Sequence, residues 1–186
     1  MPLLPMPVRY SFPEKLSDPY HDFSQKHLHQ ILSRPIQQFE WHDFQAVLGP
    51  FLPAGTYEES VYFFPFAFDF IIRSPDSAID LVSSLVWFGS EYADQLYADG
   101  LLNATRQNLL ECLNHWTSTF QVVHFNRAAC QEKGLGIQYL DCVLSTDAVG
   151  LALNDFIRFR RYQDLAIKFV RTLADHPKDR IHAAWY

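Results

Sequence analysis

The residues best suited to chemistry are two His-Asp pairs near the start of the chain. They are His21-Asp22 and His42-Asp43, and a phenylalanine follows each pair. Imidazole and carboxylate groups are the usual ligands of zinc and iron, and they also serve as general bases in hydrolysis. If the two short helices expected in this region converge, the two pairs together would form a hydrolytic or metal-dependent site.

The spacing of the histidines does not favour a site on one helix. His27 and His29 lie two positions apart, so they point to opposite sides of a helix. The chain contains neither H-E-x-x-H nor E-x-x-H, the helical arrangements typical of zinc and di-iron sites. We therefore treat an enzyme built on the His-Asp pairs as the alternative interpretation, and we expect no cofactor.

Other common catalytic and nucleotide-binding motifs are absent from the sequence. It contains no G-x-x-x-x-G-K-[ST] or G-x-G-x-x-G phosphate loop and no G-x-S-x-G nucleophile turn. Cys112 and His115 are neighbours on a helix, but no third group that would orient the imidazole is recognisable, so we expect a buried thiol. The odd number of cysteines predicts no disulfide framework and favours a reducing, cytoplasmic setting.

The composition is that of a globular protein, with 186 residues of which 48% are apolar and 19% charged. This length fits a single domain over residues 1–186. Residues 1–16 are rich in proline and are expected to form an extended N-terminal segment. No apolar run approaches the ~20 residues that a membrane-spanning helix needs, so we expect a soluble protein without a membrane partner.

Apolar residues recur mainly at helical spacing, which predicts an all-α fold. We expect a compact, irregular bundle of about six or seven helices. One short β-hairpin near residues 121–143 is the alternative, because apolar and polar residues alternate there. The helices are expected at residues 18–33, 37–48, 56–73, 74–98, 103–125 and 146–174.

Three signals in the sequence mark helix ends. Thr56-x-x-Glu59 is a capping box, in which each side chain accepts a hydrogen bond from the backbone amide of the other residue. Pro65 lies inside the following apolar run and predicts a kinked or broken helix. Asp99-Gly100 is expected to end the helix that precedes it.

Charge is distributed unevenly along the chain, whose formal net charge is −6. Between Arg34 and Arg106 lie ten acidic residues and a single basic residue, Arg73. Such a field repels nucleic acid and attracts basic proteins. We therefore expect a basic protein as partner and no nucleic acid.

Acidic and aromatic residues share helix faces within this acidic stretch. Helical spacing places Trp87 among carboxylates, on the side opposite Val82 and Val86. An aromatic ring flanked by carboxylates suits an interface, because the ring is an anchor and the charges steer a basic partner. We call this predicted docking site the acidic aromatic surface; its residues are Glu58, Tyr62, Phe66, Asp69, Asp80, Trp87, Glu91 and Asp94.

Two alternatives remain open for the charged regions. The carboxylates could serve solubility alone, with Trp87 packed under a neighbouring loop. The basic C-terminal region, which includes Arg158 and Arg161, could contact phosphate or RNA, but pairing with acidic helices of the same chain is the favoured interpretation.

These observations favour a non-catalytic, cytoplasmic protein that binds a basic protein through the acidic aromatic surface. Small acidic helical proteins without catalytic motifs include the immunity and antitoxin proteins that neutralise basic nucleases, which is an analogy of fold and charge only. A homodimer is a further alternative, because 16 phenylalanines exceed what a small core easily buries.

Overall fold

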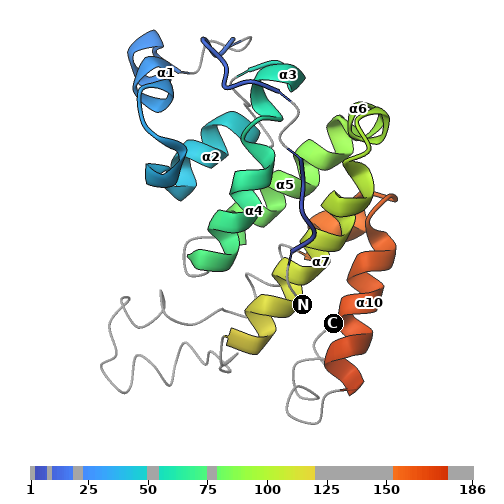
Figure 1. Cartoon of the computed structure of the whole chain (residues 1–186). Coiled ribbons are helices and arrows are strands. Elements are labelled where there is room, and N and C mark those ends of the chain that lie inside the picture. Colours follow the sequence, from blue (N-terminus) through green and yellow to red (C-terminus); the bar gives the residue numbers. More distant parts are fainter. Residues whose placement is uncertain are drawn as a thin grey trace, which may run out of the picture.

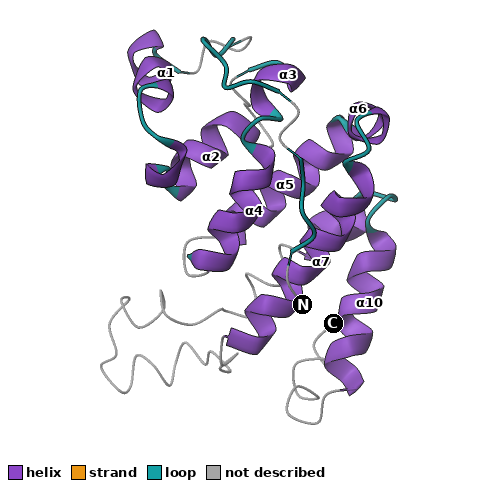
Figure 2. Cartoon of the chain, in the orientation of Figure 1, coloured by secondary structure: helices purple, strands orange, loops and turns teal. Residues whose placement is uncertain are grey.

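The described part of the chain is helical. The computed structural model describes residues 3–7, 10–18, 23–49, 55–74, 79–119 and 153–175. Every regular element in these ranges is a helix, which confirms the all-α prediction (Figures 1 and 2). The alternative hairpin near residues 121–143 lies outside the described residues. The elements are α1 (Gln25–Leu32), the 3-10 helix η1 (Ile36–Gln38), α2 (Trp41–Leu48), α3 (Tyr57–Ser60), α4 (Phe64–Arg73), α5 (Ile79–Glu91), α6 (Ala93–Ala98), α7 (Leu102–Thr119) and α10 (Gln163–Asp175).

The sequence signals at α3 and α4 are confirmed. The Thr56 N–H donates to the Glu59 carboxylate at 3.1 Å, and the Glu59 N–H donates to the Thr56 hydroxyl at 3.4 Å, which closes the capping box. Pro65 stands in the first turn of α4, where its missing N–H costs no helical hydrogen bond. The run expected as a kinked or broken helix is therefore broken, into α3 and α4.

The first expected helix is shorter than predicted. It begins at Gln25, and the Ser24 hydroxyl caps it by accepting the His27 N–H at 3.1 Å. Asp18, expected near its start, instead accepts the Phe23 N–H in the preceding loop at 2.8 Å. The helix expected over 74–98 is also interrupted, because Tyr92 leaves helical geometry between α5 and α6 (φ −103°, ψ 27°).

Helix α5 is the centre of the bundle and is covered by α2, α4 and α7 (Figure 1). Its residues Val82, Ser84 and Val86 are all fully buried, so α5 has no broad solvent face in this region. The rings of Phe64 and Phe88 pack across α4 and α5 with centroids 4.9 Å apart. Burying such rings is the main stabilising contribution of this core.

Most of the described phenylalanine side chains are buried in this core. Nine phenylalanines are buried, and Phe12 is the one that is exposed among the described residues. The homodimer alternative depends on there being more phenylalanines than one core can bury. The described part of the chain does not support that reason. The buried phenylalanines are Phe39, Phe44, Phe63, Phe64, Phe68, Phe70, Phe88, Phe156 and Phe169.

The described N-terminal residues, 3–7 and 10–18, carry no helix and run across α5 and α7 (dark blue in Figure 1). Three polar contacts hold this segment. The Asn108 side chain accepts the Leu4 N–H at 2.7 Å and donates to the Leu4 carbonyl at 3.0 Å. Farther along, the Tyr10 hydroxyl donates to Asp99 at 2.9 Å, and the Ser17 N–H donates to Glu59 at 2.8 Å.

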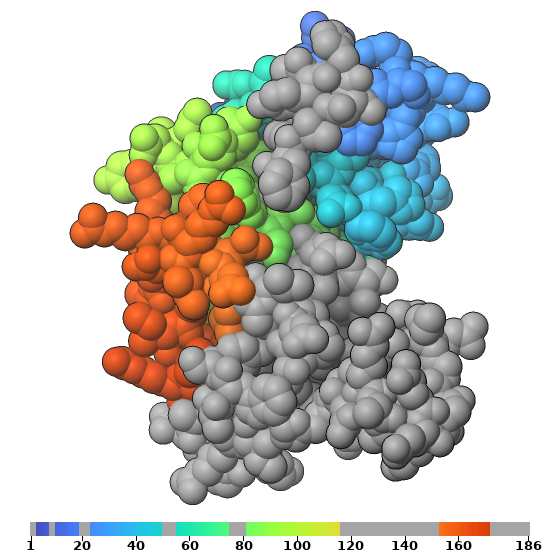
Figure 3. All heavy atoms as spheres, turned by 180° about the vertical axis from the view of Figure 1, so that it is seen from behind, coloured from blue at the N-terminus to red at the C-terminus, as the bar shows by residue number. Residues whose placement is uncertain are grey.

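Residues 153–158 form a further helical turn that leads into α10. Seen from behind in Figure 3, these orange residues border the green surface of α5 and α6. The segment 153–162 thus covers one side of the predicted docking site. No helix within the described ranges has the length and apolarity needed to cross a membrane.

Candidate functional site

The acidic aromatic surface divides into two parts with different neighbours. On α3 and α4, Glu58 and Asp69 are exposed, while the rings of Tyr62 and Phe66 are half-buried with centroids 5.4 Å apart. Phe12 of the N-terminal segment packs edge-on against Tyr62 at 5.3 Å. No described basic side chain forms an ion pair with either carboxylate of this part.

The part on α5 and α6 is covered by the chain itself. Trp87 is half-buried, and its Nε1–H donates to Asp155 at 3.2 Å. The guanidinium carbon of Arg158 lies 4.4 Å from the ring centroid of Trp87, and Phe159 packs against the same ring edge-on at 4.9 Å. Trp87 is therefore an anchor for the C-terminal segment in this structure, not a ring displayed to solvent.

The carboxylates beside Trp87 differ in their partners. Asp94 is paired with Arg161 at 3.0 Å, which confirms for Arg161 that the basic region pairs with acidic helices of the same chain. Glu91 is exposed and has no ion pair among the described residues. The side chain of Asp80 lies outside the described part, although its backbone belongs to α5. Ser84, earlier on α5, is buried.

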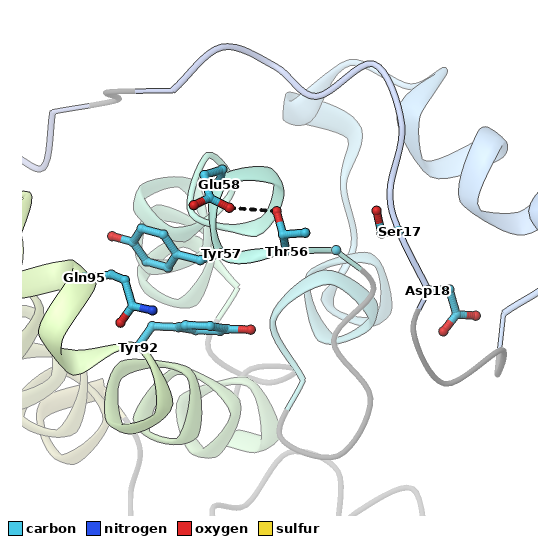
Figure 4. Close-up of a pocket in the computed structure, with 8 residues that line it drawn as sticks. Ser17, Asp18, Thr56, Tyr57, Glu58, Tyr92 and Gln95 are labelled. Atoms are coloured by element: carbon cyan, nitrogen blue, oxygen red, sulfur yellow. Dashed lines mark hydrogen bonds between the residues drawn. The ribbon is translucent and has the colours of Figure 1, made fainter.

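A pocket of about 510 Å³ lies where the end of the N-terminal segment, the start of α3 and the start of α6 meet (Figure 4). Glu58 is the single residue of the predicted surface that lines it. Figure 4 shows the Tyr92 ring below the pocket, Thr56 and Glu58 above it, and Asp18 across from them. The lining residues are Ser17, Asp18, Gly55, Thr56, Tyr57, Glu58, Tyr92 and Gln95.

Local structure fixes the upper wall of this pocket. The capping box holds Thr56 at the start of α3, and the Thr56 hydroxyl donates to Glu58 at 2.9 Å. Gly55 has a φ of +120°, and a Cβ there would lie 2.7 Å from the Ser60 hydroxyl oxygen. Any residue with a side chain would be strained at this position. Glycine therefore allows the backbone before α3 to lie close to Ser60.

The floor is aromatic and rests on a buried hydrogen-bond network. The rings of Tyr57 and Tyr92 lie with centroids 5.3 Å apart. The Tyr57 hydroxyl donates to Asp99 at 2.7 Å, and Tyr10 donates to the same carboxylate. Burial, reinforced by the hydrogen bond and the charge of Asp99, raises the pKa of Tyr57 far above its ordinary value. Tyr57 thus stays a neutral donor, and the negative charge of Asp99 lies behind the pocket.

These lining residues suit a cationic group. They offer two carboxylates, two aliphatic hydroxyl groups, an amide and two tyrosine rings, and no Lys, Arg or His is among them. Carboxylates attract a cation directly, and the faces of tyrosine rings add a cation–π attraction. The arrangement therefore has the chemistry of a cation-binding site.

The alternative site of His and Asp residues is used structurally in its described half. Asp43 is buried, forms an ion pair with Arg34, and accepts the Glu40 N–H at the start of α2 at 2.9 Å. The exposed imidazole of His42 has its Nδ1 3.5 Å from Glu40 and its Nε2 3.7 Å from Asp43. Asp43 therefore stabilises the helix start and does not point into an open site. His21 and Asp22 lie outside the described residues.

Two further chemical candidates carry no site within the described ranges. No group of three or more His, Cys, Asp or Glu side chains is arranged there to hold a metal ion. Cys112 is buried, as expected, and burial raises the pKa of its thiol, which is the opposite of what a nucleophilic thiolate needs.

Sequence reasoning missed most of the pocket. Asp18, Tyr57 and the pair Tyr92 and Gln95 come from three separate parts of the chain, and no spacing rule joins these parts. The nearest signal was the capping box, which correctly located the wall that carries Glu58. Comparison of the chain with models of protein families, with curated proteins and with solved structures finds no match in any of the three.

Proposed function

We propose that this chain is a non-catalytic binding protein whose partner is a basic protein, docked on the part of the acidic aromatic surface that α3 and α4 carry and on Glu91 of α5. The supporting observation is that Glu58, Asp69 and Glu91 are exposed and have no ion pair with any described cation. Carboxylates of this kind keep their full charge for an incoming surface, so they speed its encounter and select a basic partner.

The half-buried rings of Tyr62 and Phe66 complement these charges. They lie between Glu58 and Asp69 along α3 and α4, and Phe12 extends the same apolar patch. A partner that covers these rings removes apolar area from water, while the flanking carboxylates pair with its cations. The patch thus supplies affinity and the carboxylates supply specificity.

The chain's own C-terminal segment supports the choice of a basic partner. Arg158, Phe159 and Arg161 cover Trp87 and Asp94 by a cation–π contact, an edge-on ring contact and an ion pair. Within the molecule, one part of this surface therefore already binds a segment that is basic and aromatic. A protein with the same composition on its surface would fit the uncovered part.

An immunity or antitoxin-type role is the specific form of this proposal. A small acidic protein that occupies the basic surface of a toxin would neutralise it without catalysis. Such a protein would act in the cytoplasm, where the toxin would otherwise reach its target and where free cysteines remain reduced. The alternative of a His-Asp enzyme has less support, because Asp43 forms an ion pair with Arg34 and accepts the Glu40 N–H at the start of α2.

The test is affinity capture with a variant that removes the unpaired charges. Glu58→Gln, Asp69→Asn and Glu91→Gln are combined and compared with the wild type as bait in extracts of the source cell. We expect the wild type to retain a basic protein that the triple variant loses. The retained protein is then purified, and its affinity for both baits is measured over a range of salt concentrations.

A matched control separates a specific surface from net charge. Gln30, Gln37 and Gln38 are exposed on α1 and η1 and do not belong to the acidic aromatic surface, and changing all three to Lys alters the net charge by the same amount. This control should keep the partner. Retention by the triple variant, or equal loss in both variants, would show that the acidic aromatic surface is not the docking site.

A further inference from the structure

We propose that the pocket between α3 and α6 is the receptor for an arginine side chain of the partner. This inference rests on the proposed function and names the residue by which a basic protein would be anchored. Tyr62 and Phe66 of the apolar patch do not line the pocket. Glu58, which flanks the patch, does line it. An arginine in the pocket would therefore fix how the partner is oriented over the patch.

The ring of Tyr92 is the platform on which a guanidinium would lie. In Figure 4 this ring is seen edge-on below the pocket, with Thr56 and Glu58 on the opposite side. A planar guanidinium stacks on a tyrosine face more favourably than a compact ammonium, because it is flat and more weakly hydrated. The same contact occurs elsewhere in this chain, where Arg106 lies 5.8 Å from the centroid of Tyr162.

The acceptors around the platform suit the donors of arginine. The guanidinium has five N–H donors in one plane, whereas an ammonium is a single point of charge. Two acidic residues line the space, Glu58 from α3 and Asp18 from the N-terminal segment, and one oxygen of Asp18 also accepts the Phe23 N–H. The Gln95 amide and the Thr56 hydroxyl provide further acceptors at the edge. Because the acceptors are spread around the pocket, a group with several donors satisfies more of them than lysine does.

The walls are held by contacts within the chain, so little ordering is needed on binding. Glu59 fixes the upper wall through the capping box and also binds the N–H and the hydroxyl of Ser17, which ties the N-terminal segment to α3. Tyr57 is anchored on Asp99 below the floor. A preformed site of about 510 Å³ has room for the whole side chain of arginine and part of the neighbouring backbone.

The experiment uses the full chain and a defined probe, the blocked tripeptide N-acetyl-Gly-Arg-Gly-amide. Binding is followed by the NMR shifts of the Gln95 side-chain amide and of the backbone amide of Gly55. Two peptides serve as comparisons, one with citrulline, which keeps the shape and loses the charge, and one with lysine. We expect saturable shifts with arginine at millimolar concentration, at least about tenfold weaker binding of citrulline, and weaker binding of lysine.

Two variants with the same charge change locate the site. Glu58→Gln should weaken the arginine peptide at least about fivefold, whereas Glu14→Gln, at an exposed position outside the pocket and the acidic aromatic surface, should leave its affinity within about twofold. On α6, Tyr97→Leu is the control for ring removal, since Tyr97 is 74% exposed and does not line the pocket. Tyr92→Leu should abolish the shifts, and Tyr97→Leu should preserve them.

The outcomes separate this inference from the proposed function. If a captured basic partner is lost by the triple surface variant while the arginine peptide causes no shift, the binding function stands and the arginine pocket is wrong. Equal binding of arginine and citrulline, or of arginine and lysine, overturns the arginine assignment. Shifts that map away from Gly55 and Gln95 overturn the location.

Discussion

The guanidinium of Arg158 lies over the ring of Trp87, with its central carbon 4.4 Å from the ring centroid. This contact places a cation of the chain itself on the aromatic residue that the sequence predicted as a docking anchor. Together with the pairing of Arg161 and Asp94, it makes the C-terminal segment an internal occupant of one part of the acidic aromatic surface. The uncovered part lies on α3 and α4.

Removing these two cations should strengthen the binding of a basic partner. In the double variant Arg158→Gln, Arg161→Gln, Trp87 and Asp94 lose their internal partners and the surface becomes more negative. We expect the affinity for the captured partner to rise by about tenfold, because attraction of opposite charges increases. Stability should fall by less than about 2 kcal/mol, since exposed cation–π and ion-pair contacts are each weak.

The control for this variant is Arg160→Gln, Arg171→Gln, which changes the net charge equally at two exposed positions. Calorimetric titration of both variants with the purified partner compares them. A rise in affinity of the same size in both would mean that net charge alone, and not exposure of Trp87 and Asp94, controls binding.

The hydroxyl of Tyr162 should be a source of instability. It is fully buried and has no hydrogen-bond partner in the structure, and the side chain packs where α5 passes α7. Removing an unsatisfied buried hydroxyl relieves its desolvation cost, so Tyr162→Phe should raise the free energy of unfolding by about 1 kcal/mol. Urea denaturation measures this directly, and a loss of stability would point to a hydrogen bond that the hydroxyl makes in solution.

Gly89 and Tyr162 should be energetically coupled. A Cβ at Gly89 would lie 2.5 Å from the Tyr162 hydroxyl oxygen but 3.4 Å from the ring carbon that bears it. Gly89→Ala should therefore destabilise the wild type by about 1–3 kcal/mol through overpacking. In the Tyr162→Phe background the same change should be nearly neutral, because only ordinary contact remains. Additive effects in this double-mutant cycle would show that the close approach does not exist in solution.

Ionisation of Tyr162 should also lower the free energy of unfolding at alkaline pH. Burial raises the pKa of Tyr162 to about 12, with Arg106 opposing the shift. An unfolded tyrosine titrates near pH 10, so the stabilising contribution of this group is complete below about pH 10 and is lost as the pH rises toward 12. Compared with the wild type, Tyr162→Phe should lose less stability over this interval. Tyr57 remains in both proteins, so the difference reports Tyr162 alone.

Asn108 should control the attachment of the N-terminal segment. Its side chain is 1% exposed and pairs with both backbone groups of Leu4. Asn108→Ala removes both hydrogen bonds and leaves the Leu4 backbone unpaired, so stability should fall by about 1–3 kcal/mol. Proteases should cleave residues 3–7 faster in this variant. Asn103→Ala, at an exposed position of the same helix, should change neither property.

The sequence was sufficient for the fold class and for helix ends that depend on neighbouring residues. Thr56 and Glu59 form their capping box from side chains three positions apart. Pro65 interrupts the helix because its ring leaves no N–H to donate, and it stands in the first turn of α4. The start of α1 was wrong because Ser17 and Asp18, good caps by type, bind Glu59 and the Phe23 N–H instead. Glu59 is distant in sequence, so local pattern could not reveal this competition.

The candidate site was predicted only in part because its surroundings are tertiary. Periodicity placed Trp87 on an outward face, where it is half-buried, but the contacts of Asp155, Arg158 and Phe159 with it come from a segment that no local pattern joins to α5. Charge pattern did find Glu58 and Asp69, which stay exposed because α3 and α4 lie at the edge of the bundle. Tyr92 and Gln95 entered the pocket only through the packing of α6 near α3.

The contact between Leu4 and Asn108 joins residues 104 positions apart, and this has a consequence for the order of folding. Leu4 leaves the ribosome before its binding site on α7, because Asn108 is synthesised 104 residues later. Its docking is therefore a late, high-contact-order step, and a nascent chain must keep Leu4 and its apolar neighbours unsatisfied until then.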